Sequence, residues 1–296
     1  MVAEVLAVLN GARSVLDCTL GGGGHSLALL EAGADVTGID RDADAIAAAT
    51  ERLHSFVETG RFRAVPGDFT RVDQIASLHG ATFGGVLADL GVSSSQIDRD
   101  DRGFSFRPGV TLDMRMSASG DSAADILNRA SLEELTRVFR DYGDEPRARR
   151  LANEVVRRRG TRDFATADDL VGAIRGAFGA SAGPSDFARL FQAVRIAVND
   201  ELAGLERALP LLRDMLLPGG TMAIIAYHSG EDRIVKHAMR SWSTSCTCPP
   251  RQPVCTCGGI ALGTLVTRKS VQADAGEVAR NPRARSARLR SWRKAA

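Results

Sequence analysis

The sequence predicts an α/β fold with a parallel sheet, interrupted by an inserted helical domain. Early in the chain, short apolar runs alternate with helix-like patterns, which is typical of β–α–β units. From about residue 113 to 193 helix-like patterns continue without a convincing buried strand. The alternation then resumes and includes the strongly apolar run TMAIIAYHS. We therefore expect a discontinuous α/β domain over 1–112 and 194–296 and a helical domain over 113–193.

The expected elements follow from apolar periodicity and from turn and cap residues. Buried strands before the insertion are expected at 14–18, 35–40, 62–65 and 85–90. Helices are expected at 25–32 and 42–53, with Asp42 as the N-cap of the second. After the insertion we expect a helix at 199–216 and strands at 221–229 and 262–271.

Composition sets broad limits on the function. With 44% hydrophobic residues in 296, the chain has enough apolar side chains for a core. It lacks the roughly 18 consecutive apolar residues of a spanning helix, and it lacks the basic start of a signal peptide, so we expect a cytoplasmic protein. The net charge is only +2, but residues 280–296 carry seven basic side chains and no acid. This tail is expected to be either a frayed, solvated end or an arm that lies on phosphates.

A glycine-rich turn, LDCTLGGGGHS, follows the first expected strand and opens a helix. Glycines let the backbone approach a ligand closely, and the N–H groups of the helix end point towards it. Asp40 ends the second expected strand, about 20 residues later, where an acid accepts hydrogen bonds from ribose hydroxyls. Together they predict a nucleoside-containing cofactor, with Gly23 in the turn. The alternatives are a helix-flanking role for Asp40 and a packing role for His25.

Polar and aromatic residues also follow the third and fourth expected strands, in GDF and DLGVSSSQID. In an open parallel sheet the ligand lies beyond the strand C-termini, so Phe69, Asp89 and Gln96 should surround the same crevice. Phe69 would form an apolar wall for adenine, unless it is an ordinary core residue.

Several separated blocks, in the same order, resemble one known family. They are LDCTLGGGGHS, GIDRDADAIA, LADLGVSSSQID, RGFSF, LDMRM, FQAVRIAVNDEL, YHSGEDRIVK and NPRARSARLR. On these blocks the chain resembles the 16S ribosomal RNA cytosine-N4 methyltransferases, the RsmH or MraW family. It departs from the family pattern at Ser95 and Gly230, where the family usually has proline and leucine, and in lacking an amino-terminal segment with a His and a Pro-Val pair.

The resemblance implies a Rossmann-like S-adenosylmethionine-dependent methyltransferase domain with an inserted helical substrate-recognition domain. The implied substrate is a cytidine in the decoding region of the 16S rRNA, in the small ribosomal subunit. The implied cofactor-binding residues are Gly23, Gly24, His25, Asp40, Phe69, Asp89 and Gln96.

Transfer of a methyl group to cytosine N4 needs acceptors for the amino hydrogens and a base for the released proton. Asp113 in LDMRM and His228 after the apolar strand are the candidate catalytic residues. Asp113 could instead pair with Arg115 or Arg102, and His228 could instead orient Glu231 or Asp232.

Two basic clusters are expected to contact RNA phosphates, although solvated helix faces often have the same composition. One is the tail. The other lies in the inserted domain and comprises Arg147, Arg149, Arg150, Arg157, Arg158, Arg159 and Arg162.

Four late cysteines form two C-x-C pairs across a proline-rich turn, at Cys246, Cys248, Cys255 and Cys257. Four thiolates at this spacing suit a tetrahedral structural zinc, with reduced surface thiols as the alternative. Cys18, alone on the first strand, is expected to pack in the core.

Two other classes of function remain open from the residues alone. One is an NAD(P)-dependent oxidoreductase, disfavoured by the absence of G-x-G-x-x-G spacing and by the arginine-rich tail. The other is a non-catalytic RNA-binding factor on the same fold.

Overall fold

The computed structural model describes residues 1–92, 97, 99–117, 119–246, 248–249, 252, 254 and 256–296. The chain divides into two compact units, one of Met1–Gly91 with Leu202–Ala296 and one of Val92–Glu201. We call them the sheet unit and the helical unit. The expected limits of the insertion, 113 and 193, lie inside the helical unit.

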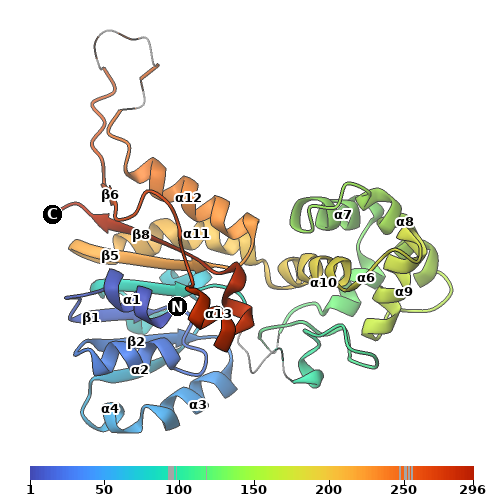
Figure 1. The fold of residues 1–296 in the computed structure, drawn as a ribbon, viewed down its shortest axis with the longest axis horizontal. Coiled ribbons are helices and arrows are strands. Elements are labelled where there is room, and N and C mark those ends of the chain that lie inside the picture. Colours follow the sequence, from blue (N-terminus) through green and yellow to red (C-terminus); the bar gives the residue numbers. More distant parts are fainter. Residues whose placement is uncertain are drawn as a thin grey trace. The chain divides into compact units, whose positions relative to one another are not determined.

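The sheet unit contains a central sheet with the strand order β3-β2-β1-β4-β5-β8-β6 (Figure 1). The first five strands in this order are parallel, and β8 pairs antiparallel with both β5 and β6. The strands are β1 Ser14–Asp17, β2 Asp35–Asp40, β3 Phe62–Pro66, β4 Phe83–Asp89, β5 Leu216–Ala226, β6 Gly263–Leu265, β7 Val271–Gln272 and β8 Arg288–Lys294. This arrangement confirms the Rossmann-like α/β expectation.

Helices cover both faces of the sheet because each central strand is apolar on both sides. Val15 of β1 lies in one core cluster with residues of α1, α2 and α3, and the adjacent Leu16 lies in a second with residues of α11 and α12. The helices of this unit are α1 Val2–Val8, α2 Gly24–Glu31, α3 Ala43–Arg52, α4 His54–Glu58, α11 Glu201–Asp214, α12 Ser229–Trp242 and α13 Ala275–Arg280, with 3-10 turns at Phe69–Gln74, Ala76–Leu78 and Pro282–Ser286.

The basic tail is not a frayed, solvated end, so that alternative was wrong, while contact of its arginines with phosphates stays a prediction. Within it, Pro282–Ser286 form a 3-10 turn and Arg288–Lys294 form β8, in which Leu289 and Trp292 are completely buried. Apolar and basic residues alternate closely enough in RLRSWRK that Leu289 and Trp292 lie in the core, while Arg288 and Arg293 are exposed. The single strand expected at 262–271 is also replaced, by the short strands β6 and β7, both paired with β8.

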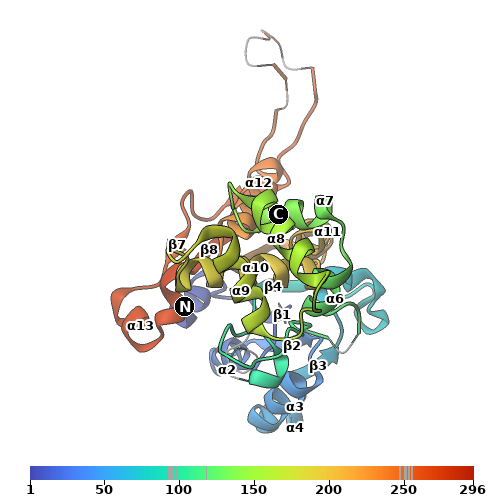
Figure 2. The same ribbon diagram turned by 90° about the vertical axis from the view of Figure 1, so that its right-hand side faces the viewer.

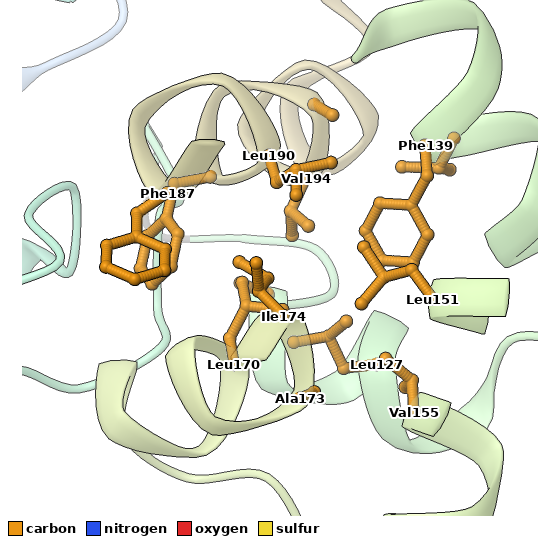
Figure 3. Close-up of a cluster of buried hydrophobic side chains, with 14 of the residues drawn as sticks. Leu127, Phe139, Leu151, Val155, Leu170, Ala173, Ile174, Phe187, Leu190 and Val194 are labelled. Carbon is orange, nitrogen blue, oxygen red and sulfur yellow. The ribbon is translucent and has the colours of Figure 1, made fainter. Parts of the chain in front are cut away.

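The helical unit has its own apolar core, in which Phe139, Leu151, Ile174, Leu190 and Val194 are buried (Figure 3). Its elements are α6 Ala123–Arg129, α7 Leu132–Arg137, a π-helical turn Val138–Tyr142, α8 Ala148–Arg159, α9 Ala167–Phe178 and α10 Pro184–Asn199, preceded by a 3-10 turn at Asp100–Arg102. Ser122, Ser131 and Thr166 begin α6, α7 and α9 with capping boxes.

The limits of the helical unit differ from the expected ones because this core recruits residues on both sides of them. Val110 and Leu112 precede residue 113 and are buried in it. Helix α10 runs past residue 193, and Val194 belongs to the same core. Hydrophobic contacts, rather than the point at which strand patterns stop, therefore set the boundary. No described helix is both long enough and apolar enough to cross a membrane.

Replacing Trp292 by alanine should destabilise the sheet unit. The Trp292 ring packs edge-to-face on Trp242 at 5.2 Å, and its Nε1 donates to Ser243 Oγ at 3.1 Å. Removing a buried aromatic ring costs about 3–5 kcal/mol of unfolding free energy, which urea denaturation would measure. Replacing the exposed Arg288 of the same strand should cost less than about 0.5 kcal/mol. Equal, small effects of both variants would contradict the assignment of the tail to the core.

Candidate functional site

The C-terminal ends of the parallel strands bring acidic side chains to one edge of the sheet. Asp17 ends β1, Asp40 ends β2 and Asp89 ends β4. The strand order reverses between β1 and β4, where the helices that follow diverge to opposite faces. Ligands of open α/β sheets bind at such a reversal, so this edge is the candidate cofactor site.

The glycine-rich turn lies at this edge and forms the start of α2. Gly21 and Gly23 have φ of +48° and +73°, the left-handed region that favours glycine. Gly23 is also the N-cap of α2, and a Cβ there would lie only 3.2 Å from Leu53 Cδ1. Gly22 and Gly24, by contrast, have nothing within 4 Å of a built Cβ. Two glycines thus shape the turn and two leave room beside it.

Asp40 is held against this turn by backbone hydrogen bonds. Its Oδ2 accepts from Gly21 N at 2.8 Å, and its Oδ1 accepts from Asp42 N at 2.9 Å. Burial raises the pKa of Asp40, and these two hydrogen bonds act in the opposite direction. The fold therefore brings the turn and the strand-end acid together, as the sequence spacing suggested.

His25 and Asp89 form the most polar part of the site. His25 Nε2 lies 3.5 Å from Asp89 Oδ2. Burial lowers the pKa of His25, but the hydrogen bond and charge of Asp89 outweigh it and the pKa is raised overall. The Tyr227 hydroxyl also faces Asp89, and burial followed by the charge of Asp89 raises its pKa.

Two atoms of this pair are buried without a hydrogen-bond partner among the described residues, His25 Nδ1 and Asp89 Oδ1. Buried polar atoms are nearly always paired, so such exceptions at a strand-end crevice indicate where a polar ligand would bind. A nucleoside cofactor carries amino, amide-like and hydroxyl groups of the kind that would satisfy them. The residues present therefore fit the group that the glycine turn and Asp40 predict.

Asp17 belongs to the site, although the sequence analysis did not select it. It is almost completely buried, accepts from Ser26 Oγ at 2.7 Å and from Thr19 N at 3.2 Å, and burial raises its pKa. Thr19 Oγ1 in turn accepts from Asp89 N at 2.6 Å. Asp17 thus braces the turn between β1 and α2. Its position at the end of a buried strand, before four glycines, was the available signal.

Phe69 and Gln96 were also expected at the cofactor site. Phe69 follows β3 and is half-buried against the core cluster that contains residues of α11, so part of its surface has the ordinary packing role. Gln96 lies outside the described residues.

His228 is the N-cap residue of α12 and is engaged with Glu231. Its Nδ1 accepts from Glu231 N at 3.4 Å, and its Nε2 lies 3.1 Å from Glu231 Oε1. The buried Glu231 also accepts from Tyr227 N at 2.9 Å. A Cβ on residue 230 would lie 3.2 Å from the His228 ring, so Gly230 leaves this ring more room than the leucine usual in the family.

A pocket of about 440 Å³ opens next to His228 in the sheet unit. Four of its lining residues are basic: Arg233, Lys236, Arg285 and Arg288. Two tail residues, Arg285 and Arg288, therefore line a basic surface pocket beside the strand-end edge. The rest of β8 remains paired in the sheet.

Asp113 lies in the helical unit and is paired with Arg115, one of the alternatives that the sequence left open. Arg115 Nε donates to Oδ1 at 2.9 Å and Nη2 to Oδ2 at 2.7 Å. The Arg115 guanidinium lowers the pKa of the Asp113 carboxyl. Between them, the buried Met114 has a φ of +60°, an uncommon conformation for a residue with a side chain.

Asn199 holds this strained loop in place, and the sequence analysis did not select it. Its Nδ2 donates to Met114 O at 2.8 Å, and its Oδ1 accepts from Met116 N at 2.9 Å. LDMRM and FQAVRIAVNDEL are thus brought together from distant parts of the sequence. Both segments are among the blocks that resemble the family, and this was the available signal in the sequence. Only the folded structure shows that they contact each other.

Most arginines of the basic cluster in the helical unit are already engaged within it. Arg157 and Arg158 pair with Glu154, Arg159 donates to the carbonyls of Leu127 and Ala130, Arg162 pairs with Asp169, and Arg147 lies over the Phe178 ring. Arg149 and Arg150 are exposed on α8, and their side chains make no hydrogen bond or ion pair among the described residues. These two are the side chains that the structure leaves available for phosphate contacts.

Three of the late cysteines, Cys246, Cys248 and Cys257, gather in one cluster. Cys255, the fourth residue of the predicted zinc set, lies outside the described residues. Cys18 is buried in the sheet core, as expected.

Comparison with known proteins agrees with this geometry. The model of the MraW methylase family matches residues 1–295. A ribosomal RNA small subunit methyltransferase H of Gemmatimonas aurantiaca is 57% identical over 296 residues, covering 100% of this chain and 94% of the relative. Proteins of the same name from Anaeromyxobacter sp. and Symbiobacterium thermophilum are 49% and 45% identical, covering 94% and 97% of this chain and 91% and 92% of the relatives.

These matches give no support to an oxidoreductase or to a non-catalytic RNA-binding factor. They extend over nearly the whole chain and include both structural units. The chain belongs to the MraW methylase family.

Proposed function

We propose that this protein transfers a methyl group from S-adenosylmethionine to the N4 amino group of a cytidine in the decoding region of 16S rRNA, in the small ribosomal subunit. The observation that carries the proposal is the strand-end site of a methylase-family chain. There Asp40 accepts a hydrogen bond from the glycine turn, and His25 Nδ1 and Asp89 Oδ1 are buried without a hydrogen-bond partner among the described residues. We place the activity in the cytoplasm, where bacterial ribosomal subunits occur.

The proposed cofactor residues are those of the sheet edge, with Gln96 added on the resemblance alone. S-adenosylmethionine supplies a methyl group activated by its sulfonium. Asp40 accepts hydrogen bonds from ribose hydroxyls, and the turn at Gly23 and Gly24 lets the backbone approach the ligand. Phe69 offers its exposed surface to the adenine ring, and His25 and Asp89 bind its polar groups.

The chain's task in the transfer step is alignment and charge stabilisation around the cytosine amino group. The lone pair of N4 is delocalised into the ring, so acceptors that hold the amino hydrogens favour the pyramidal nitrogen. Asp113 suits this role as a carboxylate, because the Arg115 guanidinium lowers its pKa and makes it a weaker base. His228 is then the proposed acceptor of the released proton, directly or through water.

The target base must be unstacked or already lie in a loop to reach such a site. We propose that Arg149 and Arg150 bind the RNA backbone from the helical unit. The basic pocket lined by Arg233, Lys236, Arg285 and Arg288 would bind it from the sheet unit. On this proposal the helical unit is the substrate-recognition domain.

Replacing Asp40 by alanine should weaken binding of the nucleoside cofactor about 10- to 100-fold, because hydrogen bonds to a charged acceptor contribute about 1.5–3 kcal/mol. Isothermal titration with S-adenosylhomocysteine measures this. Glu51→Gln, an exposed change on the neighbouring α3, is the matched control and should leave affinity unchanged. NADH should not bind either protein. Undiminished affinity of the Asp40 variant would contradict the proposed site.

Asp113→Asn and His228→Ala should each lower methylation of small-subunit particles by about 100-fold, the lower range of general acid–base effects. Affinity for S-adenosylhomocysteine should stay nearly the same. Arg115→Ala serves as the comparison for Asp113, because it breaks the ion pair without removing the carboxylate. Full activity of both the Asp113 and the His228 variants would remove these residues from the mechanism.

Arg149→Ala/Arg150→Ala should weaken RNA binding and reduce its salt dependence. Each lost phosphate contact lowers the slope of log affinity against log salt by about 0.7–0.9, so the double variant should lose nearly twice that. Filter binding over a salt series gives the slope. Arg157→Ala on the same helix removes an arginine already paired with Glu154 and should leave the slope unchanged. An unchanged slope in the double variant would rule out both contacts.

A further inference from the structure

The described residues between α12 and β6, drawn in orange, extend away from the sheet unit in both views (Figures 1 and 2). Its described residues have little apolar burial, since Val254 is 70% exposed and Ile260 is 83% exposed. A long excursion of this kind has no hydrophobic core of its own to hold it in one conformation. Another interaction must fix it if it is to have a defined shape.

Three thiols meet within this segment. The sulfur atoms of Cys246, Cys248 and Cys257 all lie within 4.8 Å of one another. Cys246 and Cys257, at the two ends of the excursion, have their sulfurs 3.7 Å apart. A disulfide would need about 2.05 Å. Four thiolates at about 2.3 Å from a tetrahedral zinc lie about 3.8 Å from each other. The observed separation therefore matches two ligands of one metal ion rather than a covalent bridge.

The backbone around the thiols also has the form of a ligand support. Thr256 N donates to Cys248 Sγ at 3.4 Å, and such N–H groups orient and stabilise thiolate ligands. A Cβ on Gly259 would lie 2.6 Å from Ser245 O, so only glycine permits this close return of the chain next to Cys257. The two ends of the excursion are thus brought together at the thiols.

We propose that Cys246, Cys248 and Cys257 bind a structural zinc ion that closes this segment. Soft thiolate ligands favour Zn²⁺ over Mg²⁺ or Ca²⁺, and a metal that joins residues 246 and 257 restricts the loop between them. The site is separate from the strand-end carboxylates and takes no part in methyl transfer.

Metal analysis of the full chain, purified in reducing buffer without chelators, should find about one zinc per chain. Cys246→Ser, Cys248→Ser and Cys257→Ser should each lose most of it. Cys18→Ser, the change of the remaining described cysteine, should retain it, because Cys18 lies in the sheet core. Zinc retained by a variant lacking all three clustered thiols, or iron in place of zinc, would overturn the proposal.

A second measurement avoids dependence on how well the variants fold. The unaltered protein, stripped of metal and kept reduced, is titrated with Co²⁺, which should give stoichiometric thiolate-to-cobalt absorption that Zn²⁺ then abolishes. Trypsin should cleave the segment between Cys248 and Cys257 faster in the stripped protein than in the zinc-loaded one. Absence of the cobalt band, or equal cleavage with and without zinc, would show that these thiols hold no metal. Affinity for S-adenosylhomocysteine, unchanged by stripping, separates failure here from failure of the proposed function.

Discussion

The site depends on a constraint of the parallel sheet, that all of its strands end at the same edge. Asp17, Asp40 and Asp89 are brought together there and are partly or fully removed from water. Buried carboxylates are costly unless hydrogen-bonded, and the glycine turn supplies that compensation through Gly21 N and Thr19 N. The same turn leaves Asp89 Oδ1 and His25 Nδ1 unsatisfied. Affinity for a polar ligand is therefore a consequence of how this edge is built.

In the helical unit, a strained loop likewise holds a carboxylate, that of Asp113, in place. Met114 adopts a positive φ, which persists only where surrounding contacts over-determine it. Asn199 provides two of these contacts and the Asp113–Arg115 pair provides others. Asp113 is consequently fixed in position and ionised, which makes it a stable hydrogen-bond acceptor. The position and charge of Asp113 therefore depend on the whole loop.

Many elements of the fold could be predicted from local sequence. The strands at β1 and β2 and the Asp42 cap of α3 follow from short-range patterns, and the structure has them at nearly the expected residues. The glycine turn and Asp40 could be paired because β–α–β geometry fixes their relation. The burial of the tail could not be predicted, because a run of arginines concealed the alternation that buries Leu289 and Trp292.

The sequence by itself determined the parallel sheet, the glycine-rich turn and membership of a methylase family, because each is encoded in contiguous blocks with their own periodicity or spacing. Tertiary structure decided which residues those blocks meet. Asn199 holding the Met114 loop, Asp89 N donating to Thr19 Oγ1 and Trp292 Nε1 donating to Ser243 Oγ all depend on contacts between distant residues. Some of these contacts join residues more than 80 positions apart, as between Asn199 and Met114. Local pattern carries no information about such distances, since only packing of the whole unit fixes them.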